Sequence, residues 1–110
     1  NVALTPLDVY DPERLFGHVC YHPDEHKALG RLLDWGFVDL FRKHCDEARQ
    51  FSFFDYRLPK AVDRGLGWRI DYVLATAPVA SQSSDARIDL APRRWKRPSD
   101  HTPVVAEFTP

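Results

Sequence analysis

The alternating segment Trp68-Arg69-Ile70-Asp71-Tyr72-Val73-Leu74-Ala75 constrains the fold of this chain more than any other part of the sequence. Alternation is typical of a strand, so the aromatic and aliphatic side chains are expected on one face, opposite Arg69 and Asp71. A carboxylate in the middle of a strand must be paired or hydrogen-bonded, because burying an isolated charge is costly. Asp71 is therefore an ion-pair partner of Arg69 or Arg64, or a functional carboxylate, and the residues alone leave both interpretations open.

Helices are predicted in the first part of the chain. One helix begins at Pro23, where the following Asp-Glu pair places negative charge at the positive end of the helix dipole, and it ends at Gly36. Its apolar stripe comprises Leu29, Leu32, Leu33 and Trp35. A second short helix is predicted over residues 38–44, with Asp39 as its N-cap.

Loops and strands are predicted elsewhere. Two prolines and two aspartates predict a loop over residues 4–12. Strands are predicted over residues 51–57, 68–75, 87–90 and 104–108. Helices followed by antiparallel strands indicate the α/β (α+β) class, as one domain over residues 1–110 with one mainly antiparallel sheet and helices on one face.

The composition excludes several classes of protein. The chain has 44% hydrophobic and 13% aromatic residues, which are too many for a disordered chain. No apolar run approaches the roughly 20 residues that a membrane span needs, and no signal-peptide pattern opens the chain, so a cytoplasmic protein without membrane contact is expected. Cys20 and Cys45 lack the spacing of a zinc site and are expected to be free thiols, although the sequence alone leaves a disulfide open.

Charge is distributed unevenly along the chain. The net charge of −1 excludes a uniformly basic nucleic-acid-binding protein. Residues 1–41 carry three basic and seven acidic side chains, however, and residues 42–110 carry twelve basic and nine acidic ones. Eleven of the fifteen basic residues are arginine, whose planar guanidinium suits phosphate. The basic C-terminal part indicates a polyanionic partner, and a solvated surface of mixed charge explains the counts almost as well.

A polar turn, Pro98-Ser99-Asp100-His101-Thr102-Pro103, precedes the last predicted strand. A lone Asp-His pair is more often an exposed turn than a catalytic group. Together with Asp71, however, it indicates a site. Asp71 can hold the His101 imidazole in one tautomer while Asp100 faces a metal ion or a proton.

Four segments, in order, resemble the C-terminal half of the exonuclease III and abasic-site (AP) endonuclease family, within the endonuclease/exonuclease/phosphatase superfamily. They are Asn1-Val2-Ala3, the Phe51–Arg57 run, Gly67-Trp68-Arg69-Ile70-Asp71-Tyr72 and Ser99-Asp100-His101. The resemblance also covers Asp8–Pro12 and Trp35–Arg42. It implies half of a four-layer α/β sandwich whose N-terminal half is absent. The inner face of the sheet would then be uncovered, and the fragment would self-associate through it.

The resemblance assigns catalytic roles to Asn1, Asp71 and His101. Asn1 matches an amide that helps hold the scissile phosphate, His101 matches the histidine on the phosphate or the attacking water, and Asp71 matches its orienting carboxylate. Asp100 matches an acid that binds or positions the metal, Mg²⁺ (or Mn²⁺). Phosphodiester hydrolysis needs an in-line water, neutralised non-bridging oxygens and help for the leaving oxygen, and these groups are coherent with that chemistry.

The resemblance also assigns substrate contacts. Phe53, Trp68 and Ile70 match positions that line a pocket for a flipped-out abasic sugar, where an aromatic wall excludes an intact base. The alternative is that these side chains belong to the core. The basic residues before the polar turn are expected to contact the DNA backbone, or else to form a solvated loop. They are Arg93, Arg94, Lys96 and Arg97.

These correspondences imply a parent enzyme of base-excision repair. It would be a Mg²⁺-dependent hydrolase with 3′–5′ exonuclease and AP endonuclease activity on double-stranded DNA with abasic sites or 3′ ends. The parent is expected to be a cytoplasmic monomer of bacterial type, and the fragment alone to be inactive, because the missing half supplies the principal metal-binding glutamate. Two alternatives stay open: a superfamily phosphoesterase with a small phosphorylated substrate, and a non-catalytic DNA-binding module.

Overall fold

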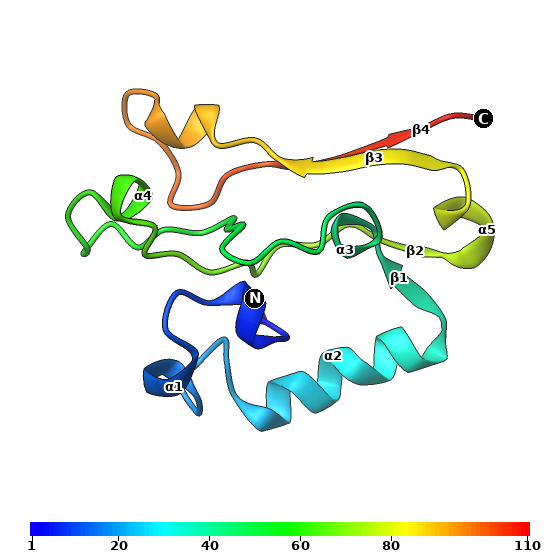
Figure 1. Cartoon of the computed structure of the whole chain (residues 1–110), viewed down its shortest axis with the longest axis horizontal. Coiled ribbons are helices and arrows are strands. Elements are labelled where there is room, and N and C mark those ends of the chain that lie inside the picture. The colour runs from blue at the N-terminus through cyan, green and yellow to red at the C-terminus, as the bar shows by residue number, and fades with distance from the viewer.

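Short helices and strands alternate along the chain, and longer irregular segments connect them (Figure 1). The computed structural model describes all residues, 1–110. The strands are β1 (Phe37–Asp39), β2 (Leu74–Thr76), β3 (Ser83–Ile88) and β4 (Val104–Phe108). The helices are α1 (Pro12–Leu15), α2 (Pro23–Trp35), α3 (Leu40–His44), α4 (Ala61–Arg64) and α5 (Ala77–Ala80), with 3₁₀ turns at Pro6–Asp8 and Ala91–Arg94.

The strands form two antiparallel ladders. β1 pairs with β2, and β3 pairs with β4. Between the ladders, isolated bridges join Trp68 to Val9 and to Phe53, and Phe53 to His101. The predicted mixed class and antiparallel pairing are therefore confirmed, but the single predicted sheet is interrupted where these bridges replace regular strands.

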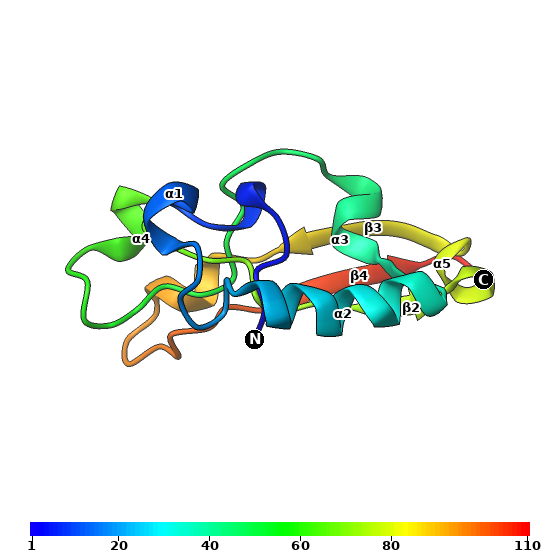
Figure 2. The same cartoon turned by 90° about the horizontal axis from the view of Figure 1, so that it is seen from below.

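The molecule is a flattened slab with extents of 42 × 32 × 21 Å. β3 and β4 run along one long edge, α2 lies along the opposite edge, and the middle of the chain passes between them (Figure 1). Seen along the slab, α1, α3 and α4 lie on one side and the amino terminus lies on the other (Figure 2). A thickness of 21 Å fits two layers, because packed layers of secondary structure lie about 10 Å apart.

Local sequence signals predict both ends of α2 correctly. Nδ1 of His22, the N-cap, accepts a hydrogen bond from the amide of Asp24 at 3.0 Å. Gly36 ends the helix with a φ of 135°, which residues with a side chain rarely adopt. The predicted apolar stripe is only partly covered in this chain, because Leu29 and Leu33 are half-buried whereas Leu32 and Trp35 are 47% and 73% exposed.

Two predicted strands differ from the structure for local reasons, and a third, β4, matches its prediction. Residues 51–57 contain only the bridge at Phe53, because the Asp55 side chain accepts a hydrogen bond from the Arg57 amide and turns the chain. β3 covers residues 83–88 rather than 87–90, and the chain then enters the 3₁₀ turn that contains Pro92.

The predicted strand over residues 68–75 is regular only at β2. Consecutive amides of a regular strand point to opposite sides, yet the amides of Ile70 and Asp71 both donate to the hydroxyl oxygen of Ser52, at 3.1 and 3.2 Å. The chain therefore leaves strand geometry at these two residues. Arg69 and Asp71 consequently reach different surroundings, although alternation assigns them to one face.

The apolar core consists of three small clusters. The first comprises Ala3, Val9, Leu15, Tyr21 and Ile70, with Tyr10, Cys20, Phe53 and Trp68 packed against it. The second comprises Leu40, Ala75, Ala80 and Ala86, and the third Phe51, Phe54 and Ala61. Both cysteines are free thiols, as predicted. No helix is long and apolar enough to cross a bilayer.

A buried ion-pair network around Arg69 joins separate parts of the chain. The Arg69 side chain is 1% exposed, and its guanidinium donates to Asp8 Oδ1 at 2.7 Å. It also donates to both carboxylate oxygens of Asp39, at 3.2 and 2.7 Å. Asp8 accepts a further hydrogen bond from Arg42 at 2.6 Å, and Asp39 is the N-cap of α3, as predicted. The network therefore ties the N-terminal loop and α3 to the segment that leads to Asp71.

Aromatic rings flank the Arg69 guanidinium, and charge partners shift the pKa values of Arg69 and Asp8. The guanidinium carbon of Arg69 lies 4.7 Å from the ring centroid of Tyr72 and 5.2 Å from that of Phe41. Burial lowers the pKa of Arg69, but its hydrogen bonds to Asp39 and Asp8 outweigh burial and raise the pKa. Burial likewise raises the pKa of Asp8, but Arg69 and Arg42 outweigh it, so that the pKa of this carboxyl is lowered.

Replacing Arg69 by methionine is expected to destabilise the protein strongly. Met keeps much of the length of the side chain but leaves Asp8 and Asp39 without their buried partner, which costs about 3–5 kcal/mol of unfolding free energy. The measurement is urea denaturation followed by circular dichroism. Arg87→Met is the matched control, because Arg87 is half exposed and solvent screens its ion pairs with Asp85 and Glu107, so that little change in stability is expected. Equal losses in the two variants would contradict a structural role of the network.

Acid is expected to weaken the fold through Asp8. Because folding lowers the pKa of this carboxyl, the unfolded chain binds more protons in acid, so the stabilisation is complete above about pH 4 and is lost as the pH falls further. Urea midpoints between about pH 2.5 and pH 6 measure this slope. Asp8→Asn should flatten it, whereas Asp85→Asn, at a half-exposed ion pair with Arg87, should retain it. An unchanged slope in Asp8→Asn would refute the assignment.

Candidate active site

His101 and Asp71 form a hydrogen-bonded pair at the surface. Nδ1 of His101 lies 3.0 and 2.9 Å from the two carboxylate oxygens of Asp71, and both side chains are about one-third exposed. The alternative ion pairs of Asp71 do not form, because Arg69 binds Asp8 and Asp39, and Arg64 donates to the carbonyl of Pro59. The carboxylate accepts, so Nδ1 is the ring nitrogen that donates, and Nε2 of His101 has no hydrogen-bond partner.

The polar turn fixes the backbone around His101. The amide of His101 donates to the hydroxyl of Ser99 at 3.1 Å, and the amide of Phe54 donates to the carbonyl of Asp100 at 2.9 Å. The imidazole packs on the ring of Phe53, with ring centroids 5.0 Å apart. His101 is therefore held by contacts to its backbone amide, to its Nδ1 atom and to its imidazole ring.

A cavity of about 180 Å³ brings four of the predicted site residues together. Asn1, Phe53, Trp68 and Ile70 all line it. Phe53 also packs on His101, although neither His101 nor Asp71 is itself a wall residue of this cavity. Phe53, Trp68 and Ile70 also contribute to the first apolar cluster, so the core interpretation and the pocket interpretation both describe them.

Four further residues, which the sequence did not indicate, also line the cavity: Val19, Cys20, Asp55 and Arg57. Arg57 donates to both carboxylate oxygens of Asp55 at 2.8–3.1 Å, and the Arg57 side chain is 88% exposed at the mouth. The Asp-x-Arg spacing directly after Phe53 is the signal that could have identified this pair. Burial, with the charge of Glu25, raises the pKa of the Cys20 thiol, so Cys20 is a neutral wall residue rather than a nucleophile.

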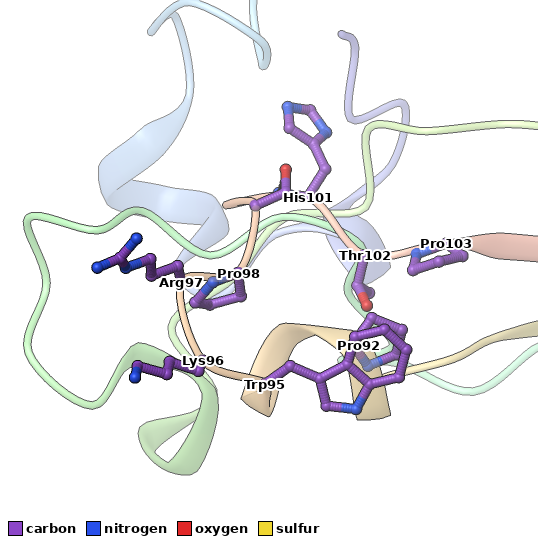
Figure 3. A pocket seen from close by; sticks show the side chains of 9 residues that line it. Pro92, Trp95, Lys96, Arg97, Pro98, His101, Thr102 and Pro103 are labelled. Carbon is purple, nitrogen blue, oxygen red and sulfur yellow. Dashed lines mark hydrogen bonds between the residues drawn. The ribbon is translucent and has the colours of Figure 1, made fainter.

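The four predicted cations of the basic loop divide into two kinds. Arg93 donates to the carbonyl of Phe54 at 3.0 Å, and Arg94 is paired with Asp63 at 2.6 Å. Lys96 and Arg97 have no hydrogen-bond or ion-pair partner, and both line a second cavity of about 460 Å³ that has no carboxylate in its wall (Figure 3). Figure 3 shows Lys96 and Arg97 pointing to one side of the loop, and the His101 imidazole projecting away from Trp95.

The chain alone does not form a metal centre. No group of three or more His, Cys, Asp or Glu side chains is placed to hold an ion. Both oxygens of Asp71 face His101, which leaves Asp100 as the one predicted ligand, and Mg²⁺ needs about six oxygen ligands. The residues present therefore do not fit a complete magnesium site, and Asp100 supplies at most one ligand.

A histidine held by a carboxylate at the edge of a pocket is typical of a hydrolytic active site. The sequence profile described as "Endonuclease/Exonuclease/phosphatase family" matches residues 1–101, and the chain belongs to this family.

Relatives and solved structures of this kind are exodeoxyribonucleases and AP endonucleases, as the resemblance implied. Exodeoxyribonuclease III of Haemophilus influenzae is 41% identical over 93 residues, which cover 84% of this chain and 34% of that protein. An AP endonuclease from Archaeoglobus fulgidus aligns with a TM-score of 0.93 and 46% identity, over 97% of this chain and 42% of that one. A 3′ phosphatase from Neisseria, bound to a product DNA hairpin, aligns with a TM-score of 0.94 and 38% identity, over 99% of this chain and 42% of that one. The chain thus spans about a third to two-fifths of these proteins.

Proposed function

We propose that residues 1–110 are the C-terminal half of a DNA-repair phosphodiesterase, with AP endonuclease and 3′–5′ exonuclease activity. The observation that carries the proposal is the His101–Asp71 pair, whose imidazole packs on Phe53, a wall residue of the cavity that Asn1 and Trp68 also line. The names of the relatives, exodeoxyribonuclease III and AP endonuclease, support this substrate class. Residues 1–110 alone would then be inactive.

Each residue of the site has a definable task in this proposal. Asp71 holds the imidazole so that Nε2 of His101 faces the phosphate or accepts a proton from the attacking water. The Asn1 amide donates to a non-bridging phosphate oxygen. Asp100 contributes one ligand to a divalent metal, on which the family generally depends, and further ligands would have to come from outside residues 1–110.

The cavity suits a sugar without a base. Its volume of about 180 Å³ is well below the roughly 300–1,000 Å³ of common small-molecule pockets. Phe53 and Trp68 would pack on the apolar face of an extruded abasic sugar, and an intact nucleoside would be excluded by size.

The two alternatives make less use of the site. A small phosphorylated substrate would use the His101–Asp71 pair but would not need Lys96 and Arg97, whose cavity wall has no carboxylate. A non-catalytic DNA-binding module would not need an oriented imidazole. The unpartnered cations and the oriented imidazole together favour a nuclease acting on double-stranded DNA.

Three further proposals concern the setting of this enzyme. The bacterial exodeoxyribonucleases among the relatives support a cytoplasmic location of bacterial type. The full-length parent would be a monomer. Residues 1–110 alone would self-associate through the uncovered face of the sheet.

On duplex DNA with one abasic site, residues 1–110 are expected to be at least about 10³-fold less active than the full-length parent, because they lack a complete metal site. Cleavage is measured on a labelled duplex with Mg²⁺, and again with Mn²⁺ and with EDTA. His101→Gln in the full-length protein is the background control. Robust cleavage by residues 1–110, or undiminished cleavage in EDTA, would overturn the half-enzyme proposal.

Lys96→Gln/Arg97→Gln in the full-length protein is expected to weaken DNA binding. Loss of two phosphate contacts should reduce the slope of log K against log salt concentration by about 2. Lys27→Gln/Arg31→Gln is the matched control, because it removes the same charge from exposed positions on α2. Hydrolysis of the small diester bis(p-nitrophenyl) phosphate should not change in either variant. If neither double substitution changed the cleavage of abasic DNA, the alternative of a small phosphorylated substrate would be favoured.

A further inference from the structure

Ser52 lies between the segments that carry Asp71 and His101. It is completely buried, with 0% exposure. Its hydroxyl oxygen accepts hydrogen bonds from the amides of Ile70 and Asp71, at 3.1 and 3.2 Å. Its carbonyl accepts a hydrogen bond from the amide of Thr102, the residue after His101, at 2.8 Å. One residue therefore contacts the backbone on both sides of the hydrogen-bonded pair.

The segments that Ser52 joins have no regular ladder to fix their spacing. Asp71 and His101 are 30 residues apart in sequence, and both precede the strands that follow them, β2 and β4. The nearest β-contacts are the isolated bridges of Phe53. The distance between the carboxylate and the imidazole thus depends on a few discrete hydrogen bonds, of which Ser52 accepts three.

The hydroxyl also explains the local backbone geometry. A serine oxygen has two lone pairs, and two consecutive amides fill both of them. Amides that converge in this way turn the chain out of strand geometry at Ile70 and Asp71. This turn allows Arg69 to enter the buried network while Asp71 faces His101.

We propose that Ser52 is a positioning residue for the His101–Asp71 pair: its hydroxyl sets the backbone of Asp71 so that the carboxylate meets Nδ1 of His101. The kinetic part of this proposal rests on the proposed nuclease function, and the structural part does not. Ser52→Ala removes the acceptor and leaves the amides of Ile70 and Asp71 without a partner, so the carboxylate is expected to shift away from the imidazole.

Ser83 provides a matched control for the loss of a buried hydroxyl. It is 8% exposed, and its hydroxyl is bonded to Lys43 and His44 at 2.9 and 3.0 Å and to the carbonyl of Ala80 at 2.8 Å. It lies in β3, whose contacts are with β4 and α3 rather than with the histidine pair. Ser83→Ala should therefore lower stability without changing the state of His101.

The first test is NMR of the full-length protein labelled with ¹⁵N-histidine, in which two-bond ¹H–¹⁵N spectra distinguish the protonated from the unprotonated ring nitrogen. His101→Gln identifies the signals of His101. Wild type and Ser83→Ala should show one tautomer with the proton on Nδ1, and Ser52→Ala should show a mixture or an exchange-broadened signal. An unchanged His101 signal in folded Ser52→Ala overturns the proposal, and so does the same change in Ser83→Ala.

The second test is steady-state cleavage of an abasic-site duplex by the same proteins. Ser52→Ala is expected to lower kcat by about tenfold to a hundredfold with little change in KM, because misplaced catalytic groups cost rate rather than substrate binding. If Ser52→Ala does not fold, Ser52→Cys carries both tests, since a thiol fills the space but accepts hydrogen bonds weakly. Wild-type kcat in the folded variant overturns the positioning role, whereas full activity of His101→Gln overturns the proposed function and leaves the NMR result valid.

Discussion

The buried guanidinium of Arg69 is the constraint on which the rest of this structure depends. Three small apolar clusters give the chain no continuous core, and the Arg69 network connects segments that carry the first two of them. Asp8 comes from the N-terminal loop and Asp39 from the start of α3, and both must be in place before the arginine can be buried without a large penalty. The network therefore specifies one arrangement of these segments, because any other arrangement leaves a buried charge unpaired.

The sequence predicted the elements whose signals are local. Pro23 with its acidic first turn, Gly36 and Asp39 act within one or two turns of their own helices, so the ends of α2 and the start of α3 followed from neighbouring residues. The strand over residues 68–75 was predicted too long because its interruption comes from Ser52, a residue distant in the chain. The burial of Arg69 was equally unpredictable, since its partner Asp8 lies 61 residues away.

In the candidate site, too, some features could be predicted from the sequence and others could not. Residues alone left Asp71 between an ion pair and a functional role with His101, and the resemblance to a family assigned catalytic roles to both residues. The basic loop shows why sequence clusters mislead: four cations adjoin one another, yet Arg93 and Arg94 are engaged by the protein itself. Lys96 and Arg97 alone are without partners, so proximity in sequence did not separate structural from available charge.

Burial is graded across the site in a way that suits hydrolysis at a surface. The side chains that react would have to be reachable, and His101 and Asp71 are each about one-third exposed. The groups that orient them need no access, and Ser52 and Arg69 are almost entirely buried. Arg69 fixes which segments meet, and Ser52 fixes how two of them are spaced. Stability and orientation are thereby assigned to different residues, Arg69 and Ser52, so a substitution can alter the geometry of the histidine pair without disrupting the ion-pair network.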